Sequence, residues 1–320
     1  MLEGKKLHVG VIGVGTMGKN HARIYSEMKS VESVSVFDLN QTAAESVAKA
    51  NNAEMCKSME DLLEHTDAVS LCVPTRFHFD VAKRIIESNI PVLIEKPICQ
   101  TAPEAQKLVD IIPNDALVGV GHIERFNPVV KEVAKILKKP LYIEIKRHNP
   151  ASSRMVDGSV VEDLMIHDID IVFNLLFTGH PTMHSAGNQD VCTVLFNFDD
   201  VPVYLSASRK SSKKIRMIYA EEEDFTIEGD LMSQEISIYR KPDRYSMENL
   251  RYTQDNLIEK VLINKTESLK EELNIFLKCV SEGKQFPITP GQALRNIQIC
   301  ESIRSHHVIT QNPVKIPSAA

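Results

Sequence analysis

The first part of the chain alternates short apolar runs with segments in which apolar residues recur every three or four positions. The apolar runs are "LHVGVIG", "SVSVFD", "DAVSLCV", "IPVLIEK" and "ALVGVGH". The helical period is found between them, near residues 17–28, 41–50, 78–88 and 102–111. Strands that are apolar on both faces suit a parallel sheet covered by helices on each side. The pattern therefore predicts a doubly wound α/β domain of the Rossmann type over residues 1–122.

After about residue 125 the strands become longer, and apolar and polar residues alternate along them. These strands are "LYIEIKRH", "VCTVLFNF", "VPVYLSAS", "IRMIYAEE", "DFTIEGD" and "QEISIYR". Several are separated only by turns, as in the hairpin expected for "NFDDVPVY", which favours antiparallel pairing. Helices are expected near residues 266–282 and 290–309, whereas residues 241–265 fit neither period. We therefore predict an α+β domain with an open, mostly antiparallel mixed sheet over residues 123–320.

Length and charge narrow the class of protein. A chain of 320 residues exceeds the size of one hydrophobic core, so two domains are expected. The net charge of −6 leaves no basic excess for a phosphate backbone, so nucleic acid is not an expected partner. No signal segment or membrane-spanning run is found, which predicts a cytosolic protein without a membrane partner. The six cysteines lack Cys-x-x-Cys spacing and are expected to be buried free thiols, with no metal site.

A glycine-rich turn joins the first predicted strand to the first predicted helix. It consists of Gly13, Val14, Gly15, Thr16, Met17 and Gly18. Glycines at this spacing allow a tight turn and close approach of the backbone to a pyrophosphate, which the helix amino terminus attracts. The turn alone is weak evidence, because glycine turns also have purely structural uses. Its position between a strand and a helix strengthens the interpretation as a dinucleotide site.

Asp38 ends the next predicted strand and is the acidic residue that such a site requires. A carboxylate there accepts hydrogen bonds from the adenosine ribose and repels a 2′-phosphate. Leu39, Asn40 and Gln41 follow, without an arginine to bind that phosphate. NAD is therefore expected in preference to NADP. An alternative role for Asp38, compatible with the first, is to cap the following helix.

A charged pair ends the strand "VLIEKPICQT". In an open parallel sheet the ligand crevice lies outside the carboxyl ends of the strands, so Glu95 and Lys96 need not be buried. Lys96 could accept a proton from a substrate hydroxyl and stabilise an alkoxide, with Glu95 as its anchor. Pro97 fixes the local backbone, and its peptide bond could be cis. The alternative is an exposed Lys-Pro turn without a function.

One helix is predicted over residues 159–179, closed by Gly179. Asp163, His167, Asp170 and Asn174 form a polar stripe on this otherwise apolar helix, and we expect the stripe to line a cleft. Asp163 and His167 are one turn apart, so the carboxylate could orient an imidazole that takes a proton from a hydroxyl. The alternative is a hydrogen-bonded core histidine. A metal site is not favoured, because no third ligand has matching spacing.

Because these motifs occur together and in this order along the chain, the chain resembles the Gfo/Idh/MocA family of oxidoreductases. The resemblance rests on the glycine turn, on "VPTRFHFDVA", on "EKP" and on Asp163-x-x-x-His167. It implies an NAD- or NADP-binding Rossmann domain and a second domain whose sheet forms the interface of a dimer or tetramer. It also implies that Lys96, Asp163 and His167 are catalytic. Near the cofactor the resemblance would place Gly13, Gly15, Thr16, Met17, Gly18, Asp38, Pro74, Thr75, His78 and Glu95.

A narrower resemblance concerns the substrate. "VGHIERFNP" and "HNPASSRMVDGSVVEDLMIHDIDI" are similar to members that oxidise UDP-N-acetylglucosamine or its uronic acid at the sugar 3-hydroxyl. It makes Arg125, Asn127 and Arg154 candidates for contacts with a nucleotide-sugar. For each arginine, a surface ion pair is the alternative.

We therefore expect an NAD-dependent dehydrogenase that acts on a sugar or nucleotide-sugar. Alternatives are a dehydrogenase of a free sugar or inositol, and a dinucleotide sensor without catalytic activity. A Rossmann-type methyltransferase is disfavoured by the pyrophosphate-type turn and by the charged end of "VLIEKP".

Overall fold

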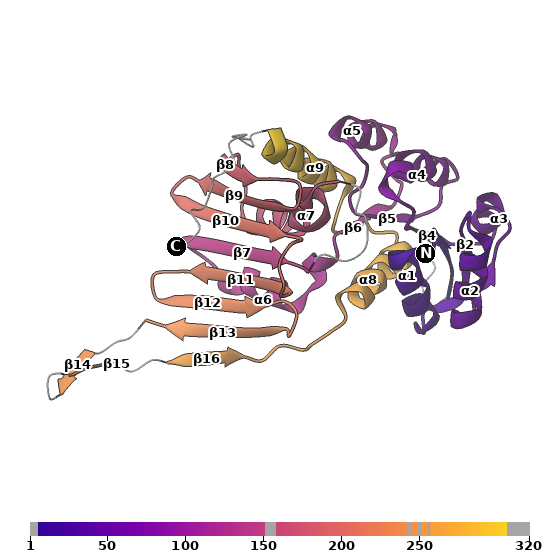
Figure 1. The fold of residues 1–320 in the computed structure, drawn as a ribbon. Helices are drawn as coiled ribbons and strands as arrows, with labels where there is room; N and C mark the ends of the chain where they lie inside the picture. The colour runs from indigo at the N-terminus through magenta and orange to yellow at the C-terminus, as the bar shows by residue number, and fades with distance from the viewer. Residues whose placement is uncertain (1–5, 151–157, 242–244, 249–250, 255–256, 306–320) are drawn as a thin grey trace, which may run out of the picture. The chain divides into compact units, whose positions relative to one another are not determined.

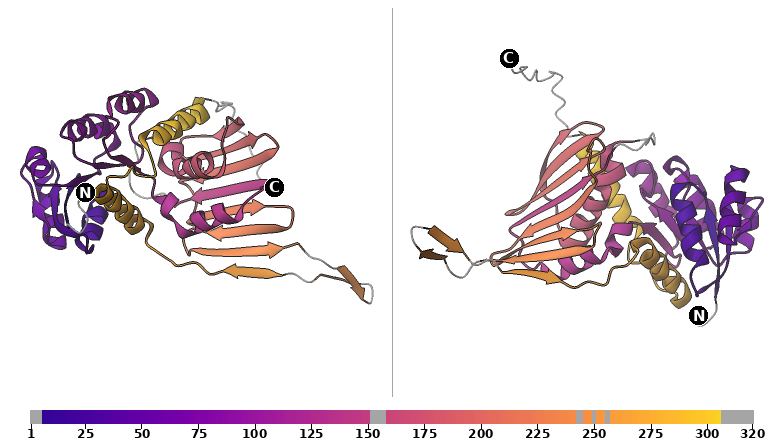
Figure 2. Two further views of the ribbon diagram at one scale, coloured as in Figure 1. Left: turned by 180° about the vertical axis from the view of Figure 1, so that it is seen from behind. Right: turned by 60° about the horizontal axis from the view of Figure 1, so that its bottom comes forward.

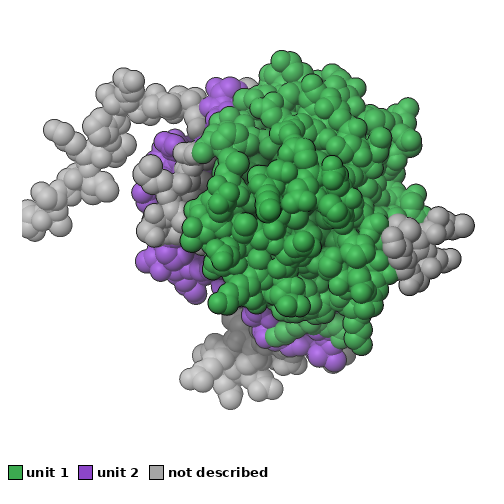
Figure 3. All heavy atoms as spheres, turned by 90° about the vertical axis from the view of Figure 1, so that its right-hand side faces the viewer, with its two compact units in different colours: residues 1–131, 264–298 green, residues 132–263, 299–320 purple. Residues whose placement is uncertain are grey.

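The computed structural model describes residues 6–150, 158–241, 245–248, 251–254 and 257–305. The chain forms two compact units, residues 1–131 with 264–298 and residues 132–263 with 299–320 (Figure 3). The sequence predicted a domain boundary after residue 122, whereas the first unit continues to residue 131. The return of residues 264–298 to the first unit was not anticipated from the sequence.

The first unit contains a six-stranded parallel sheet in the order β3-β2-β1-β4-β5-β6, with helices on both faces (Figure 1). Its strands are β1 (Leu7–Ile12), β2 (Val31–Phe37), β3 (Glu54–Met55), β4 (Ala68–Leu71), β5 (Val92–Glu95) and β6 (Val118–Gly121). Its helices are α1 (Thr16–Ser26), α2 (Gln41–Asn51), α3 (Met59–Glu64), η1 (Thr75–Phe77), α4 (His78–Glu87), α5 (Ala102–Ile111), η2 (Ile123–Phe126) and α8 (Ser268–Glu282). The strands β4, β5 and β6 are buried along their full length, which explains their continuous apolar runs. The predicted doubly wound domain is confirmed.

Aromatic packing attaches α8 and the segment after it to the first unit. The ring centroid of Phe286 lies 5.8 Å from that of Phe126 and 6.0 Å from that of Phe276. Gly119 in β6 makes room for Phe286, because a Cβ there would lie 2.6 Å from its ring. Each such aromatic pair contributes about 0.5–1.5 kcal/mol beyond its buried area. The helices α6 (Pro128–Ile136) and α9 (Pro290–Ser305) each contain residues of both units.

The second unit contains an eight-stranded sheet in the order β16-β13-β12-β11-β7-β10-β9-β8. Its strands are β7 (Tyr142–His148), β8 (Thr182–Gly187), β9 (Val191–Phe198), β10 (Val201–Ser208), β11 (Ile215–Glu221), β12 (Phe225–Asp230), β13 (Glu235–Arg240) and β16 (Ile258–Val261). Only β7 and β10 pair in parallel, so the predicted mixed, mostly antiparallel sheet is confirmed. The hairpin expected at "NFDDVPVY" is also confirmed, with Asp199 at positive φ in its turn. The strands β14 (Tyr245–Glu248) and β15 (Arg251–Gln254) pair separately, and with β16 they lie in the region that the sequence left unassigned.

The helix expected over residues 159–179 lies on one face of this sheet (Figure 2). It consists of α7 (Ile166–Ile171) between two π-helical stretches, η3 (Val161–Met165) and η4 (Val172–Leu176). It ends earlier than predicted, because Phe177 is extended and stacks on Phe198 with ring centroids 4.5 Å apart. Gly179 adopts a positive φ in the turn that follows the helix. Single π turns are frequent at functional sites, and here Asp163 lies within the first π-helical stretch and His167 follows it in α7.

All six cysteines are free, and five are buried, as expected; Cys72 is half-buried. Among the described residues, every helix is too short or too polar to span a bilayer.

Candidate active site

The glycine-rich turn has the geometry that a dinucleotide pyrophosphate requires. Gly13 has a φ of +86°, and a Cβ on it would lie 2.7 Å from the backbone nitrogen of Val73. A Cβ on Gly18 would lie 1.8 Å from the carbonyl oxygen of Gly13, so both glycines are needed for the turn itself. Gly15 is exposed and has open space around it. No side chain of the described residues caps α1, so its amino-terminal N–H groups remain available for an anion.

Asp38 lies beside this turn at the end of β2. Its Oδ2 accepts a hydrogen bond from the backbone nitrogen of Val14 at 2.8 Å, and its Oδ1 accepts one from Asn40 at 2.8 Å. The helix-cap alternative for Asp38 is wrong, because Asn40 caps α2 by accepting a hydrogen bond from Ala43 at 3.1 Å. A carboxylate has about four acceptor sites, so both bonds leave capacity for a ribose.

The charged end of β5 differs from the expectation in one respect. Lys96 is half-buried, but Glu95 is buried, with 7% of its surface exposed. Glu95 is held by His21, whose Nε2 lies 2.9 Å from Oε1, and it accepts the backbone N–H of Lys96 at 3.2 Å through Oε2. The peptide bond between Lys96 and Pro97 is cis, as the sequence allowed. Glu95 therefore anchors the backbone of Lys96.

His78 supports the same turn from α4. Its Nδ1 lies 2.8 Å from the carbonyl oxygen of Pro97, and its Nε2 lies 2.8 Å from that of Val73. Burial lowers the pKa of His78, and the hydrogen bonds to the carbonyl oxygens of Val73 and Pro97 offset part of this effect. Pro74 and Thr75 begin η1 just after Val73, with Pro74 exposed and Thr75 half-buried. His78 thus links the ends of β4 and β5.

In the second unit, Asp163 and His167 are half-buried on one helix, as is Asn174, whereas Asp170 is fully buried and accepts a hydrogen bond from Asn174 at 3.0 Å. Asp163 faces a partner that the sequence did not suggest, because Nη1 of Arg209 lies 4.0 Å from its carboxylate. Arg209 also donates to the carbonyl oxygens of Gly158 and Gln189, at 3.0 and 2.8 Å.

A buried ion pair fixes the same helix to the sheet. Asp168 is completely buried and receives hydrogen bonds from Nε of Arg147 at 3.0 and 3.1 Å and from Nη2 at 2.7 Å. Arg147 is itself only 1% exposed on β7. The sequence interpretation overlooked Arg147, although its alternation with Ile143 and Ile145 already placed it on the inner face of the strand.

The three residues suggested for substrate contacts differ in their surroundings. Arg125 is half-buried in η2. Asn127 is buried and already engaged, because its Oδ1 accepts the backbone N–H of Val129 at 3.0 Å at the start of α6, and its Nδ2 donates to Glu124 at 3.3 Å. Arg154 lies outside the described residues.

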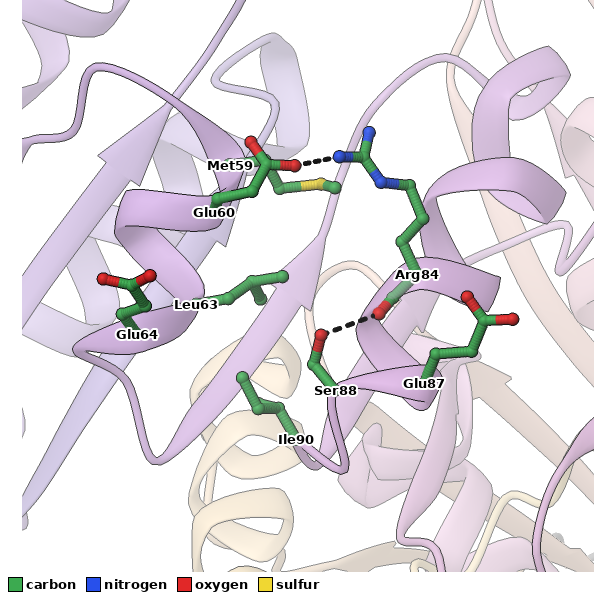
Figure 4. Close-up of a pocket in the computed structure, with 8 residues that line it drawn as sticks. All are labelled: Met59, Glu60, Leu63, Glu64, Arg84, Glu87, Ser88 and Ile90. Carbon is green, nitrogen blue, oxygen red and sulfur yellow. Dashed lines mark hydrogen bonds and ion pairs between the residues drawn. The ribbon is translucent and has the colours of Figure 1, made fainter.

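A surface pocket of the first unit lies away from these groups, between α3 and α4 (Figure 4). It is lined by Met59, Glu60, Leu63, Glu64, Arg84, Glu87, Ser88 and Ile90. Arg84 forms an ion pair with Glu60 across it. Ile90 precedes β5, so the pocket lies near the amino end of that strand, whereas ligands of open α/β sheets bind at the carboxyl ends.

Comparisons with known proteins show what the chain is similar to. Residues 7–122 match the family model GFO_IDH_MocA, described as an oxidoreductase family with an NAD-binding Rossmann fold. A UDP-N-acetylglucosamine 3-dehydrogenase of Acidithiobacillus ferrooxidans is 28% identical over 284 residues, which cover 86% of this chain and 89% of that protein. An inositol 2-dehydrogenase of Saccharopolyspora erythraea is 30% identical, but over 53% of this chain and 54% of that protein.

A solved structure of the Acidithiobacillus ferrooxidans UDP-N-acetylglucosamine 3-dehydrogenase superimposes with a TM-score of 0.82 at 26% identity, covering 94% of this chain and 98% of that one. Residues 7–122 thus match the NAD-binding Rossmann domain of the Gfo/Idh/MocA family of oxidoreductases, and over most of its length the chain is similar to the UDP-N-acetylglucosamine 3-dehydrogenase.

Proposed function

We propose that this oxidoreductase transfers a hydride between a secondary hydroxyl carbon of a UDP-amino sugar and NAD. The observation that carries the choice of substrate is the extent of similarity. The UDP-N-acetylglucosamine 3-dehydrogenase matches 86% of the chain, which includes most of the second unit, whereas the inositol 2-dehydrogenase matches 53%. A free sugar or inositol is the competing substrate class.

The residues present fit a dinucleotide. The open space at Gly15 and the uncapped start of α1 suit a pyrophosphate, with Thr16 and Met17 in the first turn. Asp38 would accept the ribose hydroxyls and disfavour the additional phosphate of NADP. Pro74, Thr75 and His78, which lie beyond the end of β4, complete the proposed cofactor site. When bound, the nicotinamide supplies the hydride chemistry, and the protein supplies alignment and charge.

Lys96 and His167 are the residues proposed to manage the hydroxyl proton. An amine or imidazole within hydrogen-bonding reach of the hydroxyl contributes about 10²–10⁴-fold to the rate by proton transfer. Asp163 would favour the protonated form of His167, and Arg209 lies 4.0 Å from the Asp163 carboxylate. Arg125 and Arg154 remain candidates for the phosphates or a carboxylate of the nucleotide-sugar, because a guanidinium binds both in a bidentate manner. Asn127 stays a weaker candidate, since helix capping already engages its side chain.

We further propose that the eight-stranded sheet forms the interface of a homodimer or homotetramer. Leu195, Tyr204 and Tyr219 belong to one row across the sheet, with Glu144 between the two tyrosines, on the side opposite to the buried residues of the same strands. Leu195 is 41% exposed within a single chain, so association would remove apolar surface from water. Sedimentation of the wild type as a monomer at micromolar concentration would contradict this part of the proposal.

The test is to follow reduced nicotinamide by its absorbance while UDP-sugars, free sugars and inositols are offered with NAD or NADP. We expect turnover with a UDP-amino sugar and a higher kcat/KM with NAD. Lys96→Ala should lower kcat by about 10²-fold or more while NAD affinity stays within a few-fold. Gly15→Ala is the matched cofactor variant, and it should weaken NAD binding without lowering Tm, because its Cβ meets only open space. Turnover restricted to free polyols would reject the nucleotide-sugar, and undiminished turnover of Lys96→Ala would remove Lys96 from the mechanism.

A further inference from the structure

A small cluster of buried polar side chains surrounds Glu95, the residue before Lys96, in the first unit. Its centre is the carboxylate of Glu95, which bonds to His21 at 2.9 Å and to the backbone nitrogen of Lys96 at 3.2 Å. His21 is completely buried in α1, the helix that begins at the glycine-rich turn. Gly121 on the neighbouring strand leaves room for the carboxylate, because a Cβ there would lie 3.3 Å from its carbon atom. A side chain at position 121 would therefore crowd the Glu95 carboxylate.

The surroundings of Glu95 determine its charge. Burial by itself raises the pKa of Glu95, but the hydrogen bond from His21 and the positive charges of His21 and Lys96 outweigh it, so that the pKa is lowered overall. Other titratable groups also act on this cluster: Tyr25 from α1, Cys72 after β4, His78 from α4 and Glu272 from α8. Glu95 is thus an anion at neutral pH, and its charge interacts with that of Lys96.

We propose that Glu95 and His21 are positioning residues for Lys96. The inference rests on the proposed function, in which Lys96 accepts the hydroxyl proton. Glu95 fixes the backbone of Lys96 and supplies a negative charge that favours its ammonium form, and His21 keeps the carboxylate in that position. Because His21 belongs to α1, the pair also ties the helix of the dinucleotide turn to the strand end that carries Lys96.

A bound metal is the competing explanation of the cluster. His21, Cys72 and Glu95 bring potential ligand atoms within 4.8 Å of one another. Burial raises the pKa of the Cys72 thiol well above its usual value, and two nearby carboxylates raise it further, so a metal would have to displace the thiol proton in order to bind. The separation of 2.9 Å between His21 and Glu95 is that of a direct hydrogen bond. These observations favour the hydrogen-bonded pair.

The experiment compares Glu95→Gln, His21→Gln and His21→Leu with Tyr25→Phe. Tyr25→Phe removes a buried hydroxyl bonded to Ser70 at 2.7 Å without touching the Glu95–His21 bond, so it controls for general disturbance of the cluster. For each variant, kcat, both KM values, the pH profile of kcat/KM, Tm and zinc content are measured with the substrate found active.

His21→Gln retains an N–H donor and should keep kcat within a few-fold. His21→Leu should lower kcat by roughly 10–100-fold, because a base displaced by a fraction of an ångström loses much of its effect. Both KM values should change little. Glu95→Gln should move the acidic limb of the profile to lower pH, because removal of the anion makes the ammonium form of Lys96 less favourable. Tyr25→Phe should leave the profile unchanged.

A wild-type pH profile in Glu95→Gln would overturn the inference, as would equal losses in His21→Gln and His21→Leu. Zinc at about one atom per chain, lost in His21→Leu, would replace the positioning pair by a metal site. Should His21→Leu fail to fold, the isosteric Glu95→Gln decides. If no sugar, UDP-sugar or inositol is turned over, the proposed function itself fails. If Lys96→Ala retains full turnover, the function stands but Lys96 leaves the mechanism, and the positioning role is rejected with it. If Lys96→Ala alone is impaired, the function stands and the positioning role is rejected.

Discussion

Each of the two candidate catalytic side chains has a buried carboxylate as its neighbour in the sequence, but the two carboxylates are held by different hydrogen-bond partners. Lys96 follows the buried Glu95, and His167 precedes the buried Asp168. Glu95 is held by one hydrogen bond from an imidazole, whereas Asp168 is held by three contacts from a guanidinium that is always charged. The carboxylate in the second unit is therefore held by more hydrogen bonds and by a group of permanent charge. The difference leads us to expect that the loss of Asp168 costs more stability than the loss of the Glu95 charge.

The largest expected effect on stability comes from breaking the ion pair between Arg147 and Asp168. Asp168→Leu leaves the guanidinium of Arg147 buried without its carboxylate and should lower the free energy of unfolding by about 3–5 kcal/mol. The measurement is chemical denaturation followed by circular dichroism. The double variant Arg147→Met with Asp168→Leu removes both charges and should regain most of that loss, because a buried pair is often no better than a well-packed apolar one. A loss below about 1 kcal/mol in the single variant would show that the pair is not an anchor.

The sequence predicted the features of this structure that depend on local patterns, but not the contacts between distant residues. The dinucleotide turn, the parallel sheet and the mixed sheet could be predicted because they depend on local patterns, namely glycine spacing, continuous apolar runs and alternation. Lys96 and Glu95 could be placed at a strand end for the same reason. Whether Asp38 contacts ribose, and whether Lys96, Asp163 and His167 act in catalysis, stays a prediction.

The partners of the buried carboxylates could not be predicted from local pattern alone. His21 is separated from Glu95 by 74 positions and Arg147 from Asp168 by 21, so each contact depends on tertiary packing. Periodicity did contain a signal for Arg147, since it occupies the inner face of β7 with Ile143 and Ile145. A charged residue on such a face requires a buried counter-charge, and Asp168 on an apolar helix was an available partner.

A smaller effect on stability is expected from neutralising Glu95. The pKa of Glu95 is lower in the folded chain than its ordinary value of 4.5, so its stabilising contribution is present above that value and is lost as the pH falls through the folded pKa. Glu95→Gln should reduce the free energy of unfolding at pH 7 by on the order of 1–3 kcal/mol, as for a hydrogen bond to a charged group. The difference between wild type and variant should shrink as the pH is lowered below 4.5. A difference that is independent of pH between 7 and 3.5 would contradict an ionised Glu95 in the folded state.

The smallest effects on stability are expected from two helix caps, one after the Lys96 segment and one before His167. Oγ1 of Thr101 accepts the backbone N–H of Glu104 at 3.3 Å and caps α5, which follows the Lys96 segment. Oγ of Ser159 accepts the N–H of Val161 at 3.0 Å, at the start of the helix that carries His167.

Replacement of either cap by alanine should cost about 1 kcal/mol of stability, because one amino-terminal N–H then loses its acceptor. Asparagine at either position caps nearly as well and serves as the matched control. Thermal unfolding measures all four variants. Since the anchor at Asp168 holds the helix of His167 independently of its cap, Ser159→Ala should leave kcat nearly unchanged. A large loss of kcat in Ser159→Ala that Ser159→Asn restores would mean that the position of His167 depends on the helix start rather than on the ion pair of Arg147.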